Sequence, residues 1–203
     1  MQAIIDFVLE LERLKAVTRK IRLRESGRLE NSAEHSWQLA LFAFSLRDCA
    51  PGGVYFDRVI RMLLVHDLGE IEIEIGDTMA FVEVGLEQRK RDERAAVTQL
   101  FGALPERDGD ELLALWEEFE DAVTTEARFA HAIDRAMPVL HNLANAGQSW
   151  RENRISFERV VRRIRPPIET GCPALWEYLE PRLHEALARG WFGAGNMPEQ
   201  SRR

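Results

Sequence analysis

The sequence predicts an all-α fold built as a single compact domain. Apolar residues recur three and four positions apart in almost every long segment, which is the spacing of an amphipathic helix. The length of 203 residues suits one domain with a sizeable core, and 45% hydrophobic and 30% charged residues are ordinary for a globular protein. No internal repeat or linker interrupts the chain, so we expect the domain at 1–192 and a polar tail at 193–203.

The limits of the helices follow from capping residues and helix breakers. Asn31 followed by Glu34 predicts a capping box, and Pro166-Pro167 is expected to separate the last two helices. The arginine-rich segment 21–30 is expected to be a loop. Residues 71–75 alternate like a strand but lie between helices, so we interpret them as an irregular connection. Helices are expected at 3–19, 31–46, 57–66, 83–103, 110–121, 124–143, 156–165 and 173–190, with Asp57 capping the third, a turn at 105–109, and Thr124 or Thr125 capping the sixth.

The composition argues against several classes of protein. A net charge of −7 is unlike a general nucleic-acid binder, although a local cationic pocket can still hold a small anion. Cys49 and Cys172 lack the paired spacing of a disulfide framework or a thiolate zinc site. The N-terminal residues do not resemble a signal peptide, and no apolar stretch approaches the roughly 20 residues that span a bilayer. We therefore expect a cytoplasmic protein with no membrane partner.

Two histidines and two aspartates indicate the chemistry. His66 and Asp67 are adjacent at the end of an expected helix, His35 comes from an earlier helix, and Asp134 comes from a later one that is otherwise largely apolar. Imidazole and carboxylate ligands together suit a divalent metal that keeps positions open for water and a substrate oxygen. These four residues therefore predict a metal centre that activates water and polarises a phosphoryl group.

Two more acidic residues are candidates for proton transfer. Glu70 lies one helical turn after His66 and is not needed as a ligand, so it is available as a general acid or base. Asp77 could position the same water or help to protonate a leaving group.

Each residue also has an explanation that needs no metal. A lone histidine at a helix end is more often a surface or capping residue. Asp67 could pair with Arg61, and Asp134 could pair with His131 one turn back on the same helix. Pro138 weakens the second alternative, because it removes the hydrogen bond to the carbonyl of residue 134 and predicts a kink where a ligand has to be directed. Each of these explanations is adequate for a single residue, but together they explain the whole set poorly.

The ordered series of motifs resembles a known family. His35, His66-Asp67 and Asp134 look like the metal-binding signature of the HD-domain phosphohydrolases. Longer stretches resemble the 5′-deoxynucleotidase branch of that family, from about residue 10 to about residue 150. These stretches are RLKAVTR from Arg13 to Arg19, ENSAEHS from Glu30 to Ser36, and HDLGE from His66 to Glu70 followed by Gly76-Asp77.

The resemblance implies an all-helical HD-domain bundle, a homodimer, and hydrolysis of (deoxy)nucleoside 5′-monophosphates to nucleoside and phosphate. It implies a divalent ion, with Mn²⁺, Co²⁺ or Mg²⁺ expected and Zn²⁺ or Fe²⁺ as alternatives. A nucleoside di- or triphosphate (pyro)phosphohydrolase on the same site, and a non-catalytic nucleotide-binding module, remain as alternative functions. The implied roles are metal binding for His35, His66, Asp67 and Asp134, catalysis for Glu70 and Asp77, phosphate binding for Arg19 and substrate contact for Glu118.

The chain departs from the bacterial 5′-deoxynucleotidases at two places. Lys20 follows Arg19 where those enzymes have a tryptophan, so an aromatic platform near the sugar is missing. The segment between Glu70 and Asp77 is longer than in those enzymes, and Glu72 or Glu74 could take the role of Glu70.

The remaining unusual features are explained without function. The arginines between residues 151 and 165 are interpreted as a solvated helix face or an intersubunit salt-bridge surface, because the overall acidity argues against nucleic acid. The five tryptophans fall at apolar or boundary positions and are expected in the core or at a dimer interface.

Overall fold

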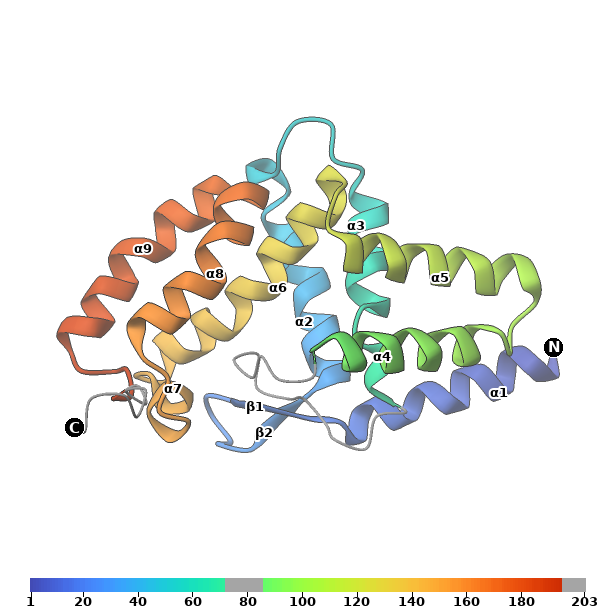
Figure 1. Cartoon of the computed structure of the whole chain (residues 1–203), viewed down its shortest axis with the longest axis horizontal. Helices are drawn as coiled ribbons and strands as arrows, with labels where there is room; N and C mark the ends of the chain where they lie inside the picture. The colour runs from blue at the N-terminus through green and yellow to red at the C-terminus, as the bar shows by residue number, and fades with distance from the viewer. Residues whose placement is uncertain (72–85, 195–203) are drawn as a thin grey trace.

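The structure is a computed structural model that describes residues 1–71 and 86–194 (Figure 1). It confirms the all-α class, because within the described ranges the strands form one two-stranded hairpin. In chain order the helices and strands are α1 (Gln2–Glu10), the 3-10 helix η1 (Leu11–Ala16), β1 (Thr18–Arg22), β2 (Leu29–Asn31), α2 (Ser32–Ser45), η2 (Arg47–Cys49), α3 (Phe56–Val65), η3 (Leu68–Ile71), α4 (Leu86–Phe101), α5 (Glu106–Asp121), α6 (Thr125–Ala144), α7 (Gln148–Glu152), α8 (Phe157–Gly171) and α9 (Pro173–Ala188).

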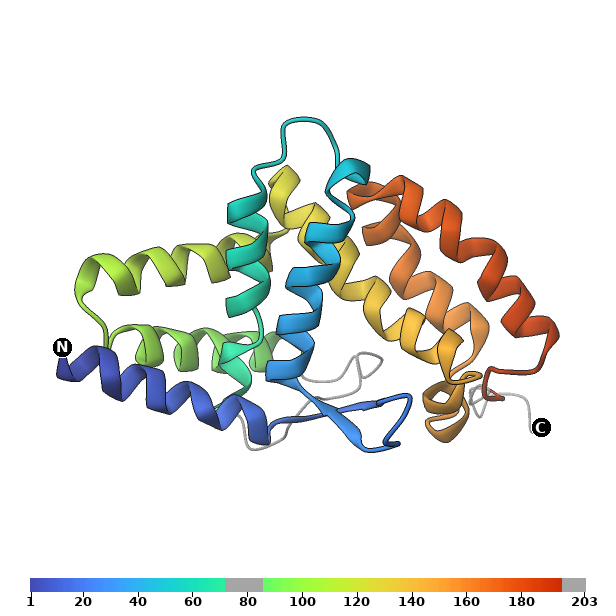
Figure 2. The ribbon, with the colours of Figure 1, turned by 180° about the vertical axis from the view of Figure 1, so that it is seen from behind.

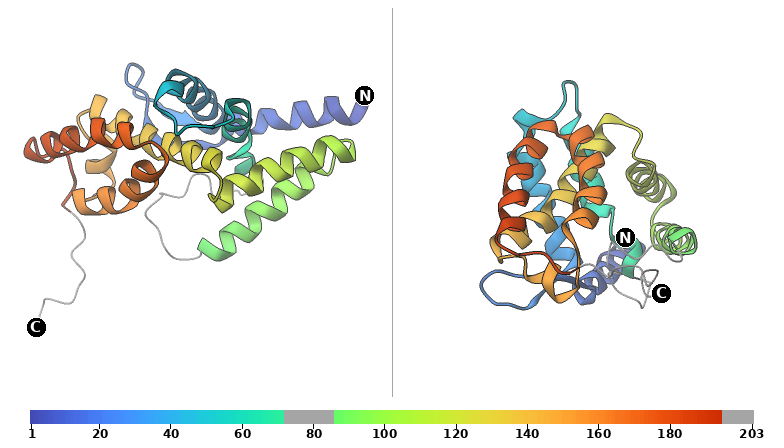
Figure 3. Two further views of the ribbon diagram at one scale, coloured as in Figure 1. Left: turned by 90° about the horizontal axis from the view of Figure 1, so that it is seen from above. Right: turned by 60° about the vertical axis from the view of Figure 1, so that its left-hand side comes forward.

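The long helix α6 lies at the centre of the fold. It packs against α8 on one side and against α2 and α3 on the other (Figure 1). Helices α8 and α9 lie alongside each other at one end of the molecule, and α4 and α5 lie alongside each other at the other end (Figure 3). Large side chains buried from these helices include Phe129, Ile133, Ile168 and Leu179, and burying each contributes about 1.5–3 kcal/mol to folding.

Helices α2 and α3 lie side by side and deliver two of the candidate residues (Figure 2). The buried faces of the two helices contribute Leu39, Met62 and Leu63, which are fully excluded from solvent. The end of α3 is held by Trp116 of α5, whose indole N–H donates to the carbonyl oxygen of His66 at 3.0 Å. The backbone at His66 is therefore fixed by a core residue from another helix.

Two of the expected helix caps are confirmed and one is wrong. Asn31 accepts a hydrogen bond from the Glu34 amide while the Glu34 side chain bonds the Asn31 amide, which completes the capping box of α2. Thr124, rather than Thr125, caps α6 by accepting from the Ala127 amide at 3.1 Å. Helix α3 begins at Phe56 without a side-chain cap, so Asp57 lies inside the helix and does not cap it.

The expected loop at 21–30 is confirmed only for residues 23–28, and the long first helix is wrong. Helix α1 ends at Glu10 and is followed by the 3-10 helix η1 to Ala16, and residues 18–22 and 29–31 form an antiparallel hairpin whose turn contains Gly27 at φ +67°. The outer edge of β1 is held by distant residues. Asn145 donates to the Arg22 carbonyl and Ser149 donates to the Lys20 carbonyl, both at 2.9 Å. Contacts more than 120 residues apart along the chain therefore select the strand over a helix or loop.

Two expected limits near prolines and turns also differ. Helix α8 continues through Pro166-Pro167 to Gly171, because Val160, Ile164 and Ile168 are buried along one face and the packing outweighs two missing backbone hydrogen bonds. Helix α5 begins at Glu106, directly after Pro105, where a turn was expected. The short helix α7 was not expected. The connection expected at 71–75 from residue 72 on, and the tail from 195 on, lie outside the described residues.

The close approach of α6 and α8 gives a test of the fold. A methyl group on Gly171 would overlap the carbonyl of Arg128 and lie 2.9 Å from the Ala132 Cβ. Gly171→Ala is expected to destabilise the fold by about 1–3 kcal/mol, measured by urea denaturation. Gly52→Ala is the control, because a methyl group there meets nothing within 4 Å. Equal stability of the two variants would mean that α6 and α8 do not pack this closely.

Candidate metal centre

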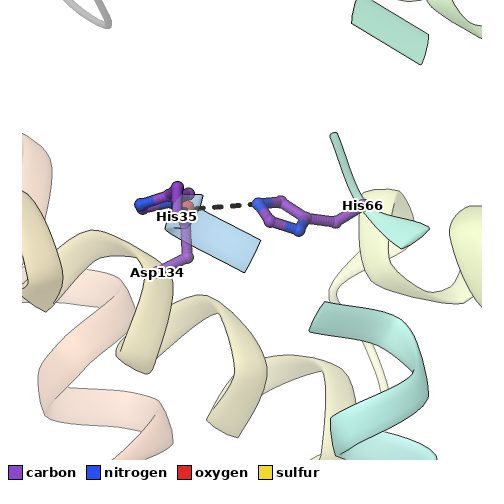
Figure 4. A group of neighbouring side chains, drawn as sticks. All are labelled: His35, His66 and Asp134. Atoms are coloured by element: carbon purple, nitrogen blue, oxygen red, sulfur yellow. Dashed lines mark hydrogen bonds and ion pairs between the residues drawn. The ribbon is translucent and has the colours of Figure 1, made fainter. Parts of the chain in front are cut away.

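Three helices bring three of the candidate ligands together. His35 lies near the start of α2, His66 lies at the C-terminal end of α3, and Asp134 lies in the middle of α6 (Figure 4). The Asp134 Oδ1 is 3.2 Å from His35 Nε2 and 4.0 Å from His66 Nε2. One ligand atom from each residue lies within 4.8 Å of the others, and all three residues are buried. Residues separated by almost 100 positions thus converge at one point.

Asp67 lies at the edge of this cluster. Its Oδ1 is 3.1 Å from His66 Nε2, and its Oδ2 accepts a hydrogen bond from Arg19 Nη1 at 2.8 Å. The alternative pairing with Arg61 is not observed, because Arg61 contacts Asp57 and Glu111. Asp67 therefore joins the cluster and Arg19.

The protonation of His66 tests whether these residues fit a metal ion. His66 Nδ1 lies 3.0 Å from the Leu63 carbonyl oxygen, which can only accept, so Nδ1 carries the proton of the neutral ring. The buried Nε2 then has its lone pair directed at the cluster, and it makes no hydrogen bond within the described chain. A backbone carbonyl that fixes the tautomer in this way is typical of metal-binding histidines. The residues present fit a divalent cation.

The pKa values show how strongly charges interact here. Burial alone would lower the pKa of His66, but the charges of Asp67 and Asp134 outweigh burial and raise it to about 9. Burial opposes ionisation of Asp67 as well, yet His66 and Arg19 hold its pKa well below the usual range. The pKa of Asp134 is also lowered, against burial, by Arg135 and by the hydrogen bond to His35. Both aspartates are anionic and available to a cation.

The alternative partner of Asp134 is engaged elsewhere. His131 Nε2 donates to the Phe119 carbonyl oxygen at 2.7 Å, and its ring stacks on the Phe119 ring with centroids 4.1 Å apart. The hydrogen-bond partner of Asp134 is instead His35, from a different helix.

The other predicted site residues divide into three groups. Arg19 and Glu70 lie beside the cluster: Arg19 contacts Asp67, and Glu70 is buried, accepting from Ser32 Oγ at 2.8 Å and Arg89 Nη2 at 3.3 Å. Glu118 contacts different residues, pairing with Arg58 and accepting from Thr124 Oγ1 at 2.6 Å. Asp77, with Glu72 and Glu74, lies outside the described residues.

The chain matches a protein-family model over most of its length. A model described as the HD domain matches residues 11–176, which include the candidate ligands described above. The chain belongs to the HD domain family. The recognition made from the sequence is thus confirmed, and His35, His66 and Asp134 are a candidate metal site within the matched region.

Relatives of known name agree with this assignment. The chain is 30% identical to the 5′-deoxynucleotidase HDDC2 of Xenopus laevis over 70% of its length and 69% of that protein. It is 30% identical to the human protein of the same name, over 68% and 66%. A crystal structure titled a predicted metal-dependent phosphohydrolase, from Magnetospirillum magnetotacticum, is 40% identical with a TM-score of 0.88 and 95% coverage of both chains. This HD domain chain is therefore a hydrolase of the phosphohydrolase type, with a divalent metal site.

Glu30 is the main residue of this HD domain that sequence reasoning missed. It is 1% exposed, and its Oε2 lies 3.3 Å from His35 Nδ1 and 3.4 Å from Arg19 Nε. Its other oxygen lies 3.9 Å from His141 Nδ1. The sequence signal that could have indicated Glu30 was its position directly before Asn31, which caps α2. Its side chain is buried because Glu30 lies in strand β2 of the hairpin. Glu30 connects His35, a candidate metal ligand, with the arginine expected to hold phosphate.

No helix in the described ranges of this HD domain combines the length and the apolar character needed to cross a bilayer.

Substitution of Glu30 is expected to weaken metal binding without touching a ligand. In Glu30→Gln the negative charge beside His35 Nδ1 is lost, and the affinity for Mn²⁺ is expected to fall about 10–100-fold in a titration followed by calorimetry. Glu34→Gln is the control, because Glu34 lies in the same segment but contacts Arg28 at the surface. Equal affinities in Glu30→Gln and the unchanged protein would contradict support of His35 by Glu30.

Metal binding is expected to release protons. His66 is protonated below about pH 9 and must be neutral to bind a metal, so binding at pH 7 expels about one proton. Affinity should therefore rise with pH, about tenfold per unit between roughly pH 6 and 8. Calorimetry in two buffers with different ionisation enthalpies measures the released protons. A pH-independent affinity would contradict the raised pKa of His66.

Proposed function

We propose that this hydrolase is a metal-dependent phosphomonoesterase that converts (deoxy)nucleoside 5′-monophosphates into nucleoside and phosphate. The observation that carries the proposal is the contact of Arg19 with Asp67, 2.8 Å apart, beside the His35, His66 and Asp134 cluster. A guanidinium group is suited to a phosphate dianion. The names of the HDDC2 relatives support the nucleotide substrate.

In this proposal the metal is held by His35, His66, Asp67 and Asp134, with Mn²⁺, Co²⁺ or Mg²⁺ as the preferred ions. The bound ion supplies Lewis acidity toward the phosphoryl group and a more acidic water. Arg19 orients the phosphate with its planar donors, and the carboxylates of Asp67 and Glu30 hold Arg19 in place.

Glu70 is proposed as the general acid or base. Its carboxylate is buried and is fixed by Ser32 and Arg89, which suits a group that exchanges a proton at a defined position. Water adds to phosphorus, the bond to the nucleoside oxygen breaks, and that oxygen receives a proton. Asp77 stays proposed as the second catalytic carboxylate, and Glu118 as a substrate contact, on the family resemblance alone.

Measurements of turnover and of metal binding should distinguish the role of Asp67 from that of Glu70. A phosphate-release screen of dNMPs, NMPs and dNTPs with Mn²⁺, Co²⁺ and Mg²⁺ is expected to favour monophosphates. Asp67→Ala should lose metal, whereas Glu70→Ala should retain metal and lose about 10²–10⁴-fold in kcat. No phosphate from any nucleotide would sink the proposal, release of pyrophosphate from dNTPs would favour the alternative reaction, and metal loss in both variants would make Glu70 a ligand.

We also propose that the protein is a homodimer that uses α2. Trp37, Leu41 and Phe44 lie on one face of α2 and are 62%, 50% and 57% exposed. Large apolar side chains grouped at the surface favour an interface with another protein surface. A self-complementary contact between two copies of α2, as in a two-fold dimer, would bury these apolar side chains.

Light scattering after gel filtration measures the dimer directly. Trp37→Glu places a charge in the α2 face and is expected to shift the protein toward monomer. Val123→Glu is the matched control, because Val123 is 65% exposed but lies in the connection between α5 and α6. A monomeric unchanged protein, or a dimer unaffected by Trp37→Glu, would contradict this assignment.

A further inference from the structure

A pocket of about 100 Å³ opens beside the candidate metal centre. Asp134 and Arg19 line it, and from Asp134 its lining follows α6 as far as Asn142. Eight residues of helix span about 12 Å, so the pocket reaches from the expected phosphate position to a point about two helical turns away. A nucleoside 5′-monophosphate is extended in the same way, with the phosphate at one end and the base at the other.

Most of the pocket wall is aliphatic. The aliphatic side chains come from β1, α6 and α8 and are those of Ile21, Pro138, Val139, Val160 and Ile164. Val139, Val160 and Ile164 are at most 5% exposed, so packing fixes their positions. Such a wall favours a group with apolar faces over one that carries several hydroxyls, because buried hydroxyls without partners cost free energy.

Each positively charged residue of the lining already has a partner. Arg19 Nη1 lies 2.8 Å from Asp67 Oδ2, and Arg135 Nη1 lies 3.6 Å from Asp134 Oδ2. The remaining cations of the lining also have interaction partners, and these are Lys20 and Arg163. The neutral nucleoside is therefore the part of a monophosphate that matches this pocket.

Two asparagines line the pocket and have different roles. Asn142 Nδ2 donates to the Pro138 carbonyl oxygen at 2.9 Å, and its Oδ1 accepts from the Trp150 amide at 3.2 Å, so Asn142 holds α7 against α6. Asn153 Nδ2 donates to the Ser149 carbonyl oxygen at 2.9 Å. Its Oδ1 is a hydrogen-bond acceptor, which suits an N–H donor on the edge of a base.

The volume of the pocket limits the base to a single ring. An engineered protein cavity of about 150 Å³ holds one benzene molecule. A pocket of about 100 Å³ that opens on one side can enclose one six-membered ring whose substituents point to the opening, but it has no space for two fused rings. Cytosine and thymine are single rings with apolar faces, and each carries an N–H donor on its base-pairing edge.

We propose that this pocket binds the nucleobase of the substrate and selects a pyrimidine over a purine. The aliphatic walls of α6 and α8 contact the faces of the ring, and the N–H edge donates to Asn153 Oδ1. This inference rests on the proposed function, which places the phosphate at Arg19. It adds a base preference to that reaction.

Equilibrium binding to the full chain loaded with Mn²⁺ tests the pocket without turnover. The 5′-phosphonate analogues of deoxycytidine, thymidine and deoxyadenosine have carbon in place of the bridging oxygen, so they cannot be hydrolysed, and they differ only in the base. Calorimetry is expected to show at least one pyrimidine analogue binding about tenfold more tightly than the deoxyadenosine analogue. The values of kcat/KM for release of phosphate from dCMP, dTMP and dAMP should follow the same order.

Variants assign the preference to the pocket. Val160→Phe fills the pocket from α8 and should lower the affinity for the pyrimidine analogue about tenfold. Val161→Phe is the matched control, because Val161 is adjacent on the same helix but is not part of the pocket wall. Asn153→Leu removes the acceptor and should reduce the same preference. Asn153 is half-buried, so this variant decides the question if Val160→Phe unfolds, which circular dichroism detects.

The outcomes separate the pocket from the reaction. A deoxyadenosine analogue that binds as tightly as both pyrimidine analogues, or a pyrimidine preference that survives in every folded pocket variant, would overturn the base pocket. Failure of every nucleotide to release phosphate, with the binding preference intact, would overturn the proposed reaction and leave the base pocket in place.

Discussion

The carboxylate of Asp134 is the charge on which this structure depends. It lies in the middle of α6, is 6% exposed, and has Ile133, Ala136 and Met137 as buried neighbours on the same helix. A buried carboxylate is costly unless partners compensate it. His35 from α2 and His66 from α3 approach it, and Arg135 lies beside it, so the ionised form is retained. The same packing of α2 and α3 against α6 therefore also assembles the candidate metal centre.

Acidic and basic side chains alternate in a chain of contacts around that centre. The cluster contacts Asp67, Asp67 contacts Arg19, and Arg19 contacts Glu30, which returns to His35. A candidate metal ligand, His35, and the arginine proposed to bind phosphate, Arg19, thus share the carboxylate of Glu30.

Much of the fold was predictable because its signals are local. The capping box at Asn31 and Glu34, the cap at Thr124 and the apolar spacing of α6 depend on residues within one or two turns. The hairpin at 18–31 was not predictable, because Asn145 and Ser149 hold its edge from the other end of the chain. The continuation of α8 through its two prolines was missed for the same reason, since burial of Ile164 and Ile168 outweighs the local preference.

The same distinction between local and long-range information applies to the candidate site. The residue types of His35, His66-Asp67, Glu70 and Asp134, with their order along the chain, determined the class of chemistry, because imidazole and carboxylate groups specify which cations can bind. The convergence of His35, His66 and Asp134, the tautomer of His66 and the contacts of Glu30 were decided only by the tertiary structure. Ligand chemistry is a property of each side chain, whereas distances, burial and shared charges exist only after distant helices have packed together.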